Sequence, residues 1–142
     1  MISNRSMPPG AIIPVLVYDD VAAAVAWLCE AFGFKERLRI GDHRAQLTLG
    51  EESVVVAARP ARAAEALQLP PGEITHSIMV RVADVDAHYE RVRQRGGRVL
   101  SPPETYPFGE RQYTVEDPGG HHWTFSQAVA DVAPEAWGGQ LR

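Results

Sequence analysis

The sequence predicts an α+β fold built from two tandem copies of one β-α-β-β-β module. A run rich in valine and isoleucine, followed by a capped amphipathic helix that stops at glycine, occurs twice. Asp20 and Asp84, which precede the two helices, are 64 residues apart, and Gly33 and Gly97, which end them, have the same separation. A match without gaps from cap to stop indicates an internal duplication.

The first predicted module covers residues 11–58. Residues 12–18 form an apolar run typical of a buried strand, and the acidic pair Asp19-Asp20 can cap the helix that follows. Three shorter runs separated by Gly-Asp and Gly-Glu turns come next. They predict strands at residues 35–40, 45–49 and 53–58.

The second predicted module covers residues 75–127 and repeats this order, with a strand at 75–82 and a helix that begins at Val85. An alanine-rich linker, residues 59–74, joins the modules, and residues 128–142 form a C-terminal tail. A chain of 142 residues has the usual length of one domain, so we expect both modules to share a single domain.

The composition limits the classes of partner that the protein can bind and the compartment in which it works. Hydrophobic residues make up 45% and charged residues 23%, which is typical of a globular protein, and the net charge of −4 argues against a nucleic-acid partner. The single cysteine, Cys29, cannot form an intramolecular disulfide and fits a reducing compartment. No apolar run approaches the roughly 20 residues that span a bilayer. We therefore expect a cytoplasmic protein without a membrane partner.

Two motifs carry a family resemblance. The run HSIMVRVADVDAHYERVRQRGG and the closing run GERQYTVEDPGGHHWTF resemble the vicinal oxygen chelate superfamily, the glyoxalase, bleomycin resistance and dioxygenase group. The resemblance covers about residues 11–127. It implies two incomplete barrels, a ligand cleft between the two halves, and a homodimer.

The resemblance also implies four positions for metal ligands, one on the first and one on the last strand of each half. Here they hold Ile13, Val56, Ser77 and Thr124. Two aliphatic side chains and two hydroxyls do not supply the nitrogen and carboxylate donors that catalytic metals need, so no cofactor is predicted. A divalent metal stays open, because His76 lies beside Ser77 and His122 shares a strand face with Thr124.

Strand alternation suggests which side chains face the ligand. Counting from Ser77 places Met79 and Arg81 on the concave face, where an arginine favours a carboxylate or phosphate, although a salt bridge at the rim is the alternative. The stretch 101–113 is rich in proline and glycine and predicts a loop over the cleft with stacking aromatic side chains, unless these seal the core. The predicted ligand-binding set is Val15, Val17, Met79, Arg81, Phe108, Arg111, Tyr113, His122 and Thr124.

These features favour a protein that binds a small planar or anionic molecule without the family metal. The alternative is a lyase, isomerase or dioxygenase of the same superfamily, with a non-standard metal site or with acid–base chemistry through His122 or Glu110. A third hypothesis is a binding module that serves a partner protein. The sequence does not decide whether the protein is an enzyme.

Overall fold

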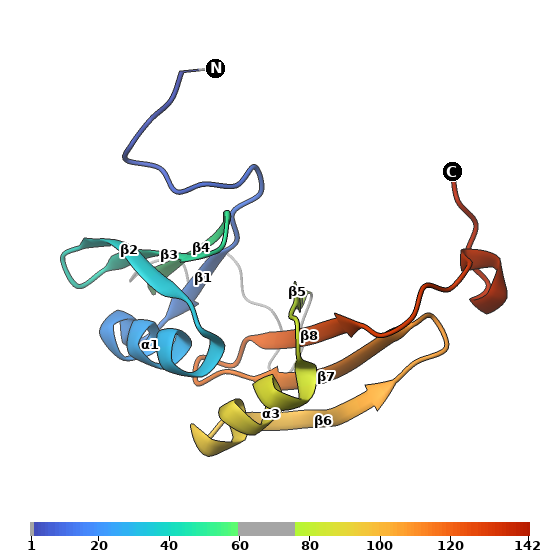
Figure 1. Ribbon diagram of the computed structural model, residues 1–142. Helices are drawn as coiled ribbons and strands as arrows, with labels where there is room; N and C mark the ends of the chain where they lie inside the picture. The colour runs from blue at the N-terminus through green and yellow to red at the C-terminus, as the bar shows by residue number, and fades with distance from the viewer. Residues whose placement is uncertain (1, 60–75) are drawn as a thin grey trace. The chain divides into compact units, whose positions relative to one another are not determined.

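The computed structural model describes residues 2–59 and 76–142 and divides into two compact units, Met1–Glu73 and Ile74–Arg142 (Figure 1). Each unit contains a four-stranded mixed sheet with a helix on one side, and the sheets are open and not closed barrels. The predicted order of one strand, one helix and three strands occurs in both units. The predicted linker, 59–74, lies outside the described residues except for Arg59.

The first unit has a sheet in the order β1-β4-β3-β2. Its outer strand β1 pairs in parallel with β4, and the remaining pairs are antiparallel. The helix α1 widens in its last turn into a short π-helix, η1. The elements are β1 (Val15–Tyr18), α1 (Val21–Trp27), η1 (Leu28–Phe32), β2 (Lys35–Ile40), β3 (Arg44–Leu49) and β4 (Glu52–Ala58).

The helix of the first unit forms as the sequence predicts. The Asp20 carboxylate accepts a hydrogen bond of 3.0 Å from the backbone N–H of Ala23 and so caps the first turn. Gly33 ends the helix with a positive φ of 82°, which glycine adopts without steric cost. The buried core of this unit lies between the helix and one face of the sheet. Its side chains include Leu16, Val25, Leu28, Ala45, Leu47 and Val56.

The second unit repeats this plan in a sheet of order β5-β8-β7-β6. Its outer strand β5 pairs in parallel with β8. The elements are β5 (Ile78–Arg81), α3 (Val85–Gln94), β6 (Arg98–Thr105), β7 (Glu110–Glu116), β8 (His122–Ala128) and a short 3-10 helix η2 (Pro134–Trp137). No helix within residues 2–59 and 76–142 is long and apolar enough to cross a membrane.

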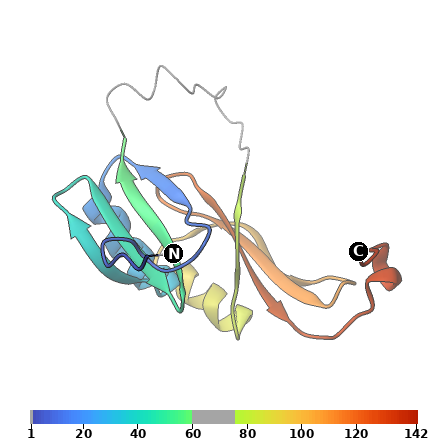
Figure 2. The same ribbon diagram turned by 90° about the horizontal axis from the view of Figure 1, so that it is seen from above.

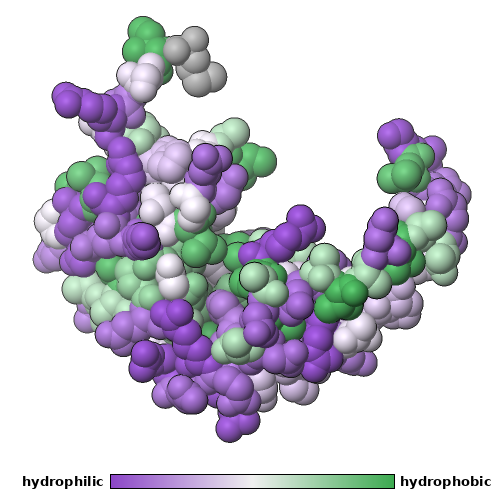
Figure 3. Space-filling view, viewed as in Figure 1, coloured by the Kyte–Doolittle hydropathy of each residue, from purple (hydrophilic) through white to green (hydrophobic). Residues whose placement is uncertain are grey.

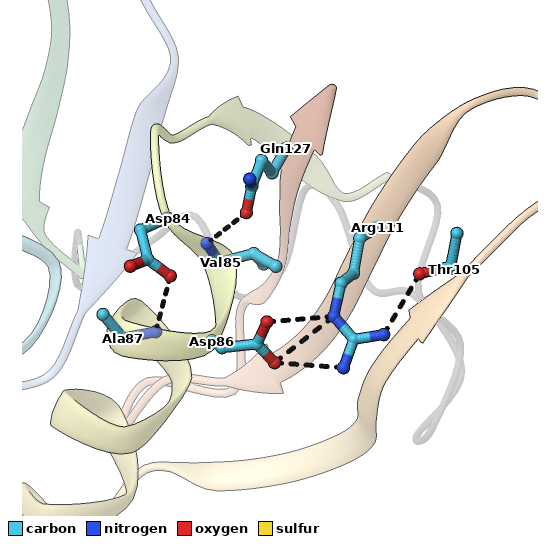
Figure 4. A network of polar contacts seen from close by, with 7 residues as sticks. All are labelled: Asp84, Val85, Asp86, Ala87, Thr105, Arg111 and Gln127. Carbon is cyan, nitrogen blue, oxygen red and sulfur yellow. Dashed lines mark hydrogen bonds and ion pairs between the residues drawn. The ribbon is translucent and has the colours of Figure 1, made fainter. Parts of the chain in front are cut away.

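Polar contacts fix α3 on its sheet (Figure 4). The Asp84 carboxylate accepts from the backbone N–H of Ala87 at 3.0 Å, and the Gln127 side-chain oxygen of β8 accepts from the N–H of Val85 at 2.9 Å. Two free N–H groups of the first turn are thereby satisfied. Beneath the helix lies an apolar layer whose members are all buried. They are Val85, Val92, Tyr113, Val115, Trp123 and Phe125.

The connection between β6 and β7 differs from the predicted loop at 101–113. Both strands continue into that stretch, and only residues 106–109 remain as a connection. The prolines Pro102 and Pro103 fit in β6 because it is the outer strand and its register shifts between Ser101 and Glu104. The predicted loop over a cleft is therefore wrong, and the segment is a long hairpin.

Within residues 2–59 and 76–142, each sheet has a second face that carries no helix of its own unit. The face of the first sheet opposite α1, here called the first open face, carries Val15, Val17, Gln46, Ser53, Val55 and Ala57. The face of the second sheet opposite α3, the second open face, carries Met79, Arg81, Glu110, Gln112, Thr114, Glu116, His122, Thr124 and Ser126. The side-chain alternation of a strand assigns these two sets.

Candidate functional site

Four of the predicted ligand-binding residues lie on the second open face. Met79 and Arg81 come from β5, and His122 and Thr124 come from the neighbouring strand β8. Met79 is directly opposite Thr124 in the parallel pairing, and the side chain of Met79 is 64% exposed. The face therefore presents an accessible surface made by two adjacent strands.

Arg81 is the cation of this surface on strand β5. It is exposed and pairs in register with Ser126 of β8. Within residues 76–142 its guanidinium forms no hydrogen bond or ion pair, in contrast to those of Arg98 and Arg111. A guanidinium that no carboxylate of its own unit neutralises is available to an anion from solution.

Hydrogen bonds link β7 and β8 across the second open face. The hydroxyl oxygens of Thr114 and Thr124 lie 3.0 Å apart. The amide of Gln112 donates to the Ser126 hydroxyl at 3.0 Å, and this hydroxyl donates to a Glu110 carboxylate oxygen at 2.7 Å. Such a chain holds its members in fixed orientations, so the face is a defined array of polar groups.

At the other end of the face, His122 lies beside a carboxylate. Its Nε2 atom is 3.2 Å from an oxygen of Glu116, and the two side chains are 24% and 23% exposed. Arg98 reaches the second oxygen of the same carboxylate at 3.4 Å. Glu116 thus orients the imidazole, while the ring remains accessible. The sequence singled out His122 but missed Glu116, which strand pairing brings opposite it.

The structure corrects the expected positions of Arg111 and Tyr113. Both lie on the helix-covered side of β7, because they alternate with Gln112 and Thr114 of the open face. The Arg111 guanidinium binds both carboxylate oxygens of Asp86 on α3, at 3.0 Å for the closest contacts, and donates to Thr105 at 3.1 Å (Figure 4). It holds the helix to the hairpin.

Tyr113 is part of the core and only 1% exposed. Its phenol oxygen lies 2.5 Å from Nδ1 of His88, and its ring stacks on Phe125 at 5.4 Å. Burial raises the pKa of the Tyr113 phenol far above its ordinary value. The ring of His88 also packs in this core, since its centroid lies 4.0 Å from that of Phe125.

Phe108 belongs to a small aromatic cluster at the end of the hairpin. Its ring stacks on Tyr106 at 5.4 Å and contacts Trp137 of η2 at 5.5 Å. The C-terminal segment reaches this point because the N–H groups of Val129 and Ala130 both donate to the carbonyl of Gly109. Trp137 thus has partners in its own chain.

The remaining predicted residues belong to the first unit. Val15 and Val17 lie on the first open face, and Val15 is 52% exposed. Val56 is fully buried on the helix side, so it does not occupy the ligand position of the family to which the sequence analysis assigned it. Strand pairing explains the error. Val55 pairs with Val15 in the first sheet as Thr124 pairs with Met79 in the second, so Val55 is the residue equivalent to Thr124.

The corrected family positions still offer poor metal ligands. Ile13 and Ser77 lie just before β1 and β5, and Val55 and Thr124 lie on the open faces. None of these side chains carries a nitrogen or a carboxylate. No group of three or more His, Cys, Asp or Glu side chains converges anywhere in residues 2–59 and 76–142. The residues present do not fit the metal of the resemblance.

Two four-stranded mixed sheets, each built as β-α-β-β-β with one covered and one open face, define a class of duplicated α+β proteins. The family model of the Glyoxalase/Bleomycin resistance protein/Dioxygenase superfamily matches residues 12–125. The chain therefore belongs to this superfamily, as the sequence motifs indicated.

Individual relatives support the assignment. An uncharacterized protein of Mycobacterium bovis is 30% identical in an alignment of 130 residues that covers 86% of this chain and 86% of that protein. The crystal structure of TioX from Micromonospora sp. ML1 is 32% identical, covers 84% of this chain and 99% of its own, and has a TM-score of 0.69. The fosfomycin resistance protein FosX from Listeria monocytogenes shares the fold at 17% identity, with a TM-score of 0.66 and coverage of 85% and 94%.

Proposed function

We propose that this protein binds a small planar or anionic molecule on the second open face, without the divalent metal of the superfamily. The observation that carries the proposal is the exposed Arg81, which stands on that face with no ion pair in residues 76–142. Its planar donors match a carboxylate or a phosphate. The neighbouring hydroxyl of Thr124 can donate to the same ligand.

The exposed side chain of Met79 supports a planar ligand. A thioether is polarizable and packs well against the edge or face of a ring. Met79 as a residue is 64% exposed. Met79 and Arg81 lie on the same face of β5, so one ligand can contact both. An aromatic carboxylate combines the two requirements.

Binding experiments with 1-naphthoate, a planar anion, and 1-naphthylmethylammonium, its cationic counterpart, test the proposal. We expect naphthoate to bind more tightly and to raise the melting temperature with the logarithm of its concentration above the Kd. Arg81→Ala should weaken naphthoate binding at least tenfold. Arg93→Ala removes the same charge from α3, on the opposite side of the sheet, and should leave the affinity unchanged. Equal affinities for both probes, or equal effects of both variants, would contradict the proposal.

The metal-free part of the proposal has its own test. The side chains of Ile13, Val55, Ser77 and Thr124 support the absence of the metal, because none of them offers a nitrogen or a carboxylate as a ligand. Elemental analysis of protein purified without a chelator, followed by titration with Mn²⁺, Fe²⁺, Ni²⁺ and Zn²⁺, should find less than stoichiometric metal. One tightly held ion per chain would favour a metalloenzyme instead.

An acid–base enzyme, such as a lyase or isomerase, is the second candidate, and the contact between His122 and Glu116 favours it. A carboxylate that fixes one imidazole nitrogen leaves the other free to accept a proton. If this candidate holds, His122→Gln abolishes turnover of a bound substrate and leaves its affinity within about twofold. If the wild type shows no turnover and His122→Gln lowers the affinity, the result supports a protein that only binds its ligand. Glu110, the other candidate, accepts from Ser126.

A homodimer, a cytoplasmic location and the absence of nucleic-acid and membrane partners are proposed on the sequence and on membership of the superfamily. Light scattering coupled to gel filtration tests the first of these. A mass of one chain at micromolar concentration would overturn the dimer.

A further inference from the structure

The N-terminal segment, residues 4–10, lies over the first open face (Figures 1 and 2). Three side chains of the sheet donate hydrogen bonds to its backbone carbonyls. Arg37 donates to the carbonyl of Arg5 at 2.7 Å, Gln46 to that of Ser6 at 2.9 Å, and Ser53 to that of Pro9 at 2.6 Å. These contacts join residues that are more than 30 positions apart in the sequence.

The three donors form one site of the first sheet. Gln46 and Ser53 are 5% and 4% exposed on strands β3 and β4. The register of β2 shifts between Glu36 and Leu38, and this bulge allows Arg37 to reach the side-chain oxygen of Gln46 at 2.5 Å. A polar site is thereby built into a face that also carries apolar side chains.

Among residues 76–142, no segment covers the corresponding positions of the second sheet. Strand pairing makes Ser53 the equivalent of His122, and His122 is 24% exposed although Ser53 is buried. The N-terminal segment therefore occupies, in the first unit, the kind of surface that is accessible in the second. Pro8 is the buried residue of the segment, and its neighbours are exposed. Figure 3 shows hydrophilic side chains of the segment at the surface.

The chemistry of the contacts identifies the class of ligand. Every one of the three donors binds a main-chain carbonyl and none binds a side chain of the segment. Recognition of this kind depends on the amide backbone and hardly on sequence. The backbone of the segment is turned, because the N–H of Met7 donates to the carbonyl of Asn4 at 3.2 Å. A proline fits the apolar part of the face, and its restricted φ lowers the entropy lost on binding.

We propose that the first open face is a binding site for proline-containing peptides whose backbone turns as that of residues 4–10 does, and that residues 4–10 are its displaceable internal occupant. A tethered segment has an effective concentration on the order of millimolar, so it excludes weak ligands from the face. A peptide then binds only where it competes with the segment or where the segment has left. This site belongs to the first sheet, whereas the ligand site proposed above belongs to the second sheet.

The test uses the full chain and a fluorescent peptide that copies residues 2–11, ISNRSMPPGA. Pro8→Asp places a charge at the buried position and should release the internal segment, while the peptide keeps its proline. We expect the peptide to bind the Pro8→Asp protein at least tenfold more tightly than the wild type, in a 1:1 complex. No binding to either protein, or equal binding to both, would overturn the proposal.

Two further variants distinguish the site from unspecific binding. In the Pro8→Asp background, Arg37→Ala should weaken peptide binding at least fivefold. Arg39→Ala removes the same charge from the same strand but on the helix side, where Arg39 pairs with Glu36, and should have no effect. Equal losses for the two variants would show that the peptide binds by charge alone and would refute the site.

A measurement on the wild type keeps the proposal testable if Pro8→Asp does not fold. ¹⁵N-labelled protein is titrated with unlabelled peptide to millimolar concentration. The amide signals of Ser6 and Met7 should move toward the positions of an unbound peptide, whereas those of α3 should not move. Unchanged Ser6 and Met7 signals at saturating peptide would overturn displacement.

Discussion

The indole N–H of Trp123 donates to a carboxylate oxygen of Asp117 at 3.0 Å, with both residues buried. The second oxygen of Asp117 accepts from the backbone N–H groups of Gly119 and His121 at 2.9 and 3.0 Å. One carboxylate thus fixes the turn between β7 and β8 and the largest side chain of the core. The turn belongs to the EDPGGHHW motif, so part of that motif has a structural role.

Replacing Asp117 should destabilise the protein strongly. Asp117→Ala leaves three N–H donors without their acceptor, two of them in the backbone, and we expect a loss of about 3 kcal/mol in the free energy of unfolding. Urea denaturation followed by circular dichroism measures it. Asp131→Ala, at an exposed position, should change stability by less than about 0.5 kcal/mol. Equal stability of the two variants would contradict the role of Asp117.

Tyr113 should make stability depend on pH in the alkaline range. Its pKa is raised in the folded protein by burial, so the folded state keeps a proton that the unfolded state releases. Stability is therefore constant below the ordinary tyrosine pKa of about 10 and falls as the pH rises above it. Tyr113→Phe removes the hydrogen bond to His88, costs about 1 kcal/mol at pH 7 and should weaken this alkaline loss. Denaturation curves at pH 8 and 10.5 provide the comparison.

Gly109 should anchor the C-terminal segment. A Cβ atom at this position would lie 2.4 Å from the carbonyl oxygen of Ala130, and its φ is +86°. Gly120 has nearly the same φ, +85°, but no described heavy atom within 4 Å of its Cβ position. We expect Gly120→Ala to cost about 1 kcal/mol through the backbone alone. Gly109→Ala should also release residues 129–142, which limited proteolysis with mass spectrometry would detect as early cleavage. Unchanged cleavage would argue against the anchor.

Cys29 should react slowly with alkylating reagents. Burial and, secondarily, the negative charge of Glu36 raise the pKa of its thiol, so less thiolate is present near neutral pH. We expect iodoacetamide at pH 8 to modify Cys29 several times more slowly than free cysteine. The same protein in concentrated urea should react at the ordinary rate. A fast reaction in the folded state would show that the thiol is accessible and ionised.

The local features of the fold could be predicted from the sequence because they depend on neighbours in the chain. Asp20, Asp84 and Gly33 cap and end helices through contacts within a few residues, and the alternation along β5 places Met79 and Arg81 on one face. The duplication appears in the sequence because both units repeat these local signals.

Other features depended on contacts between distant segments. The hairpin of β6 and β7 forms because β7 pairs with the proline-containing strand β6 and satisfies its backbone hydrogen-bonding groups. The pairing of β1 with β4 puts Val55 at the position where Val56 was expected. The sequence did not place Arg111 and Tyr113 correctly, because their contacts with Asp86 and His88 form only when α3 packs on the sheet.

The sequence by itself determined the duplicated α+β fold, its helix caps and the superfamily, since periodicity and short motifs encode them. Only the tertiary structure decided which face each strand residue occupies relative to a helix, which carboxylate orients His122, and that the N-terminal segment covers the first open face. The physical reason is that register, bulges and side-chain hydrogen bonds are set by the packing of segments 6 to 44 residues apart.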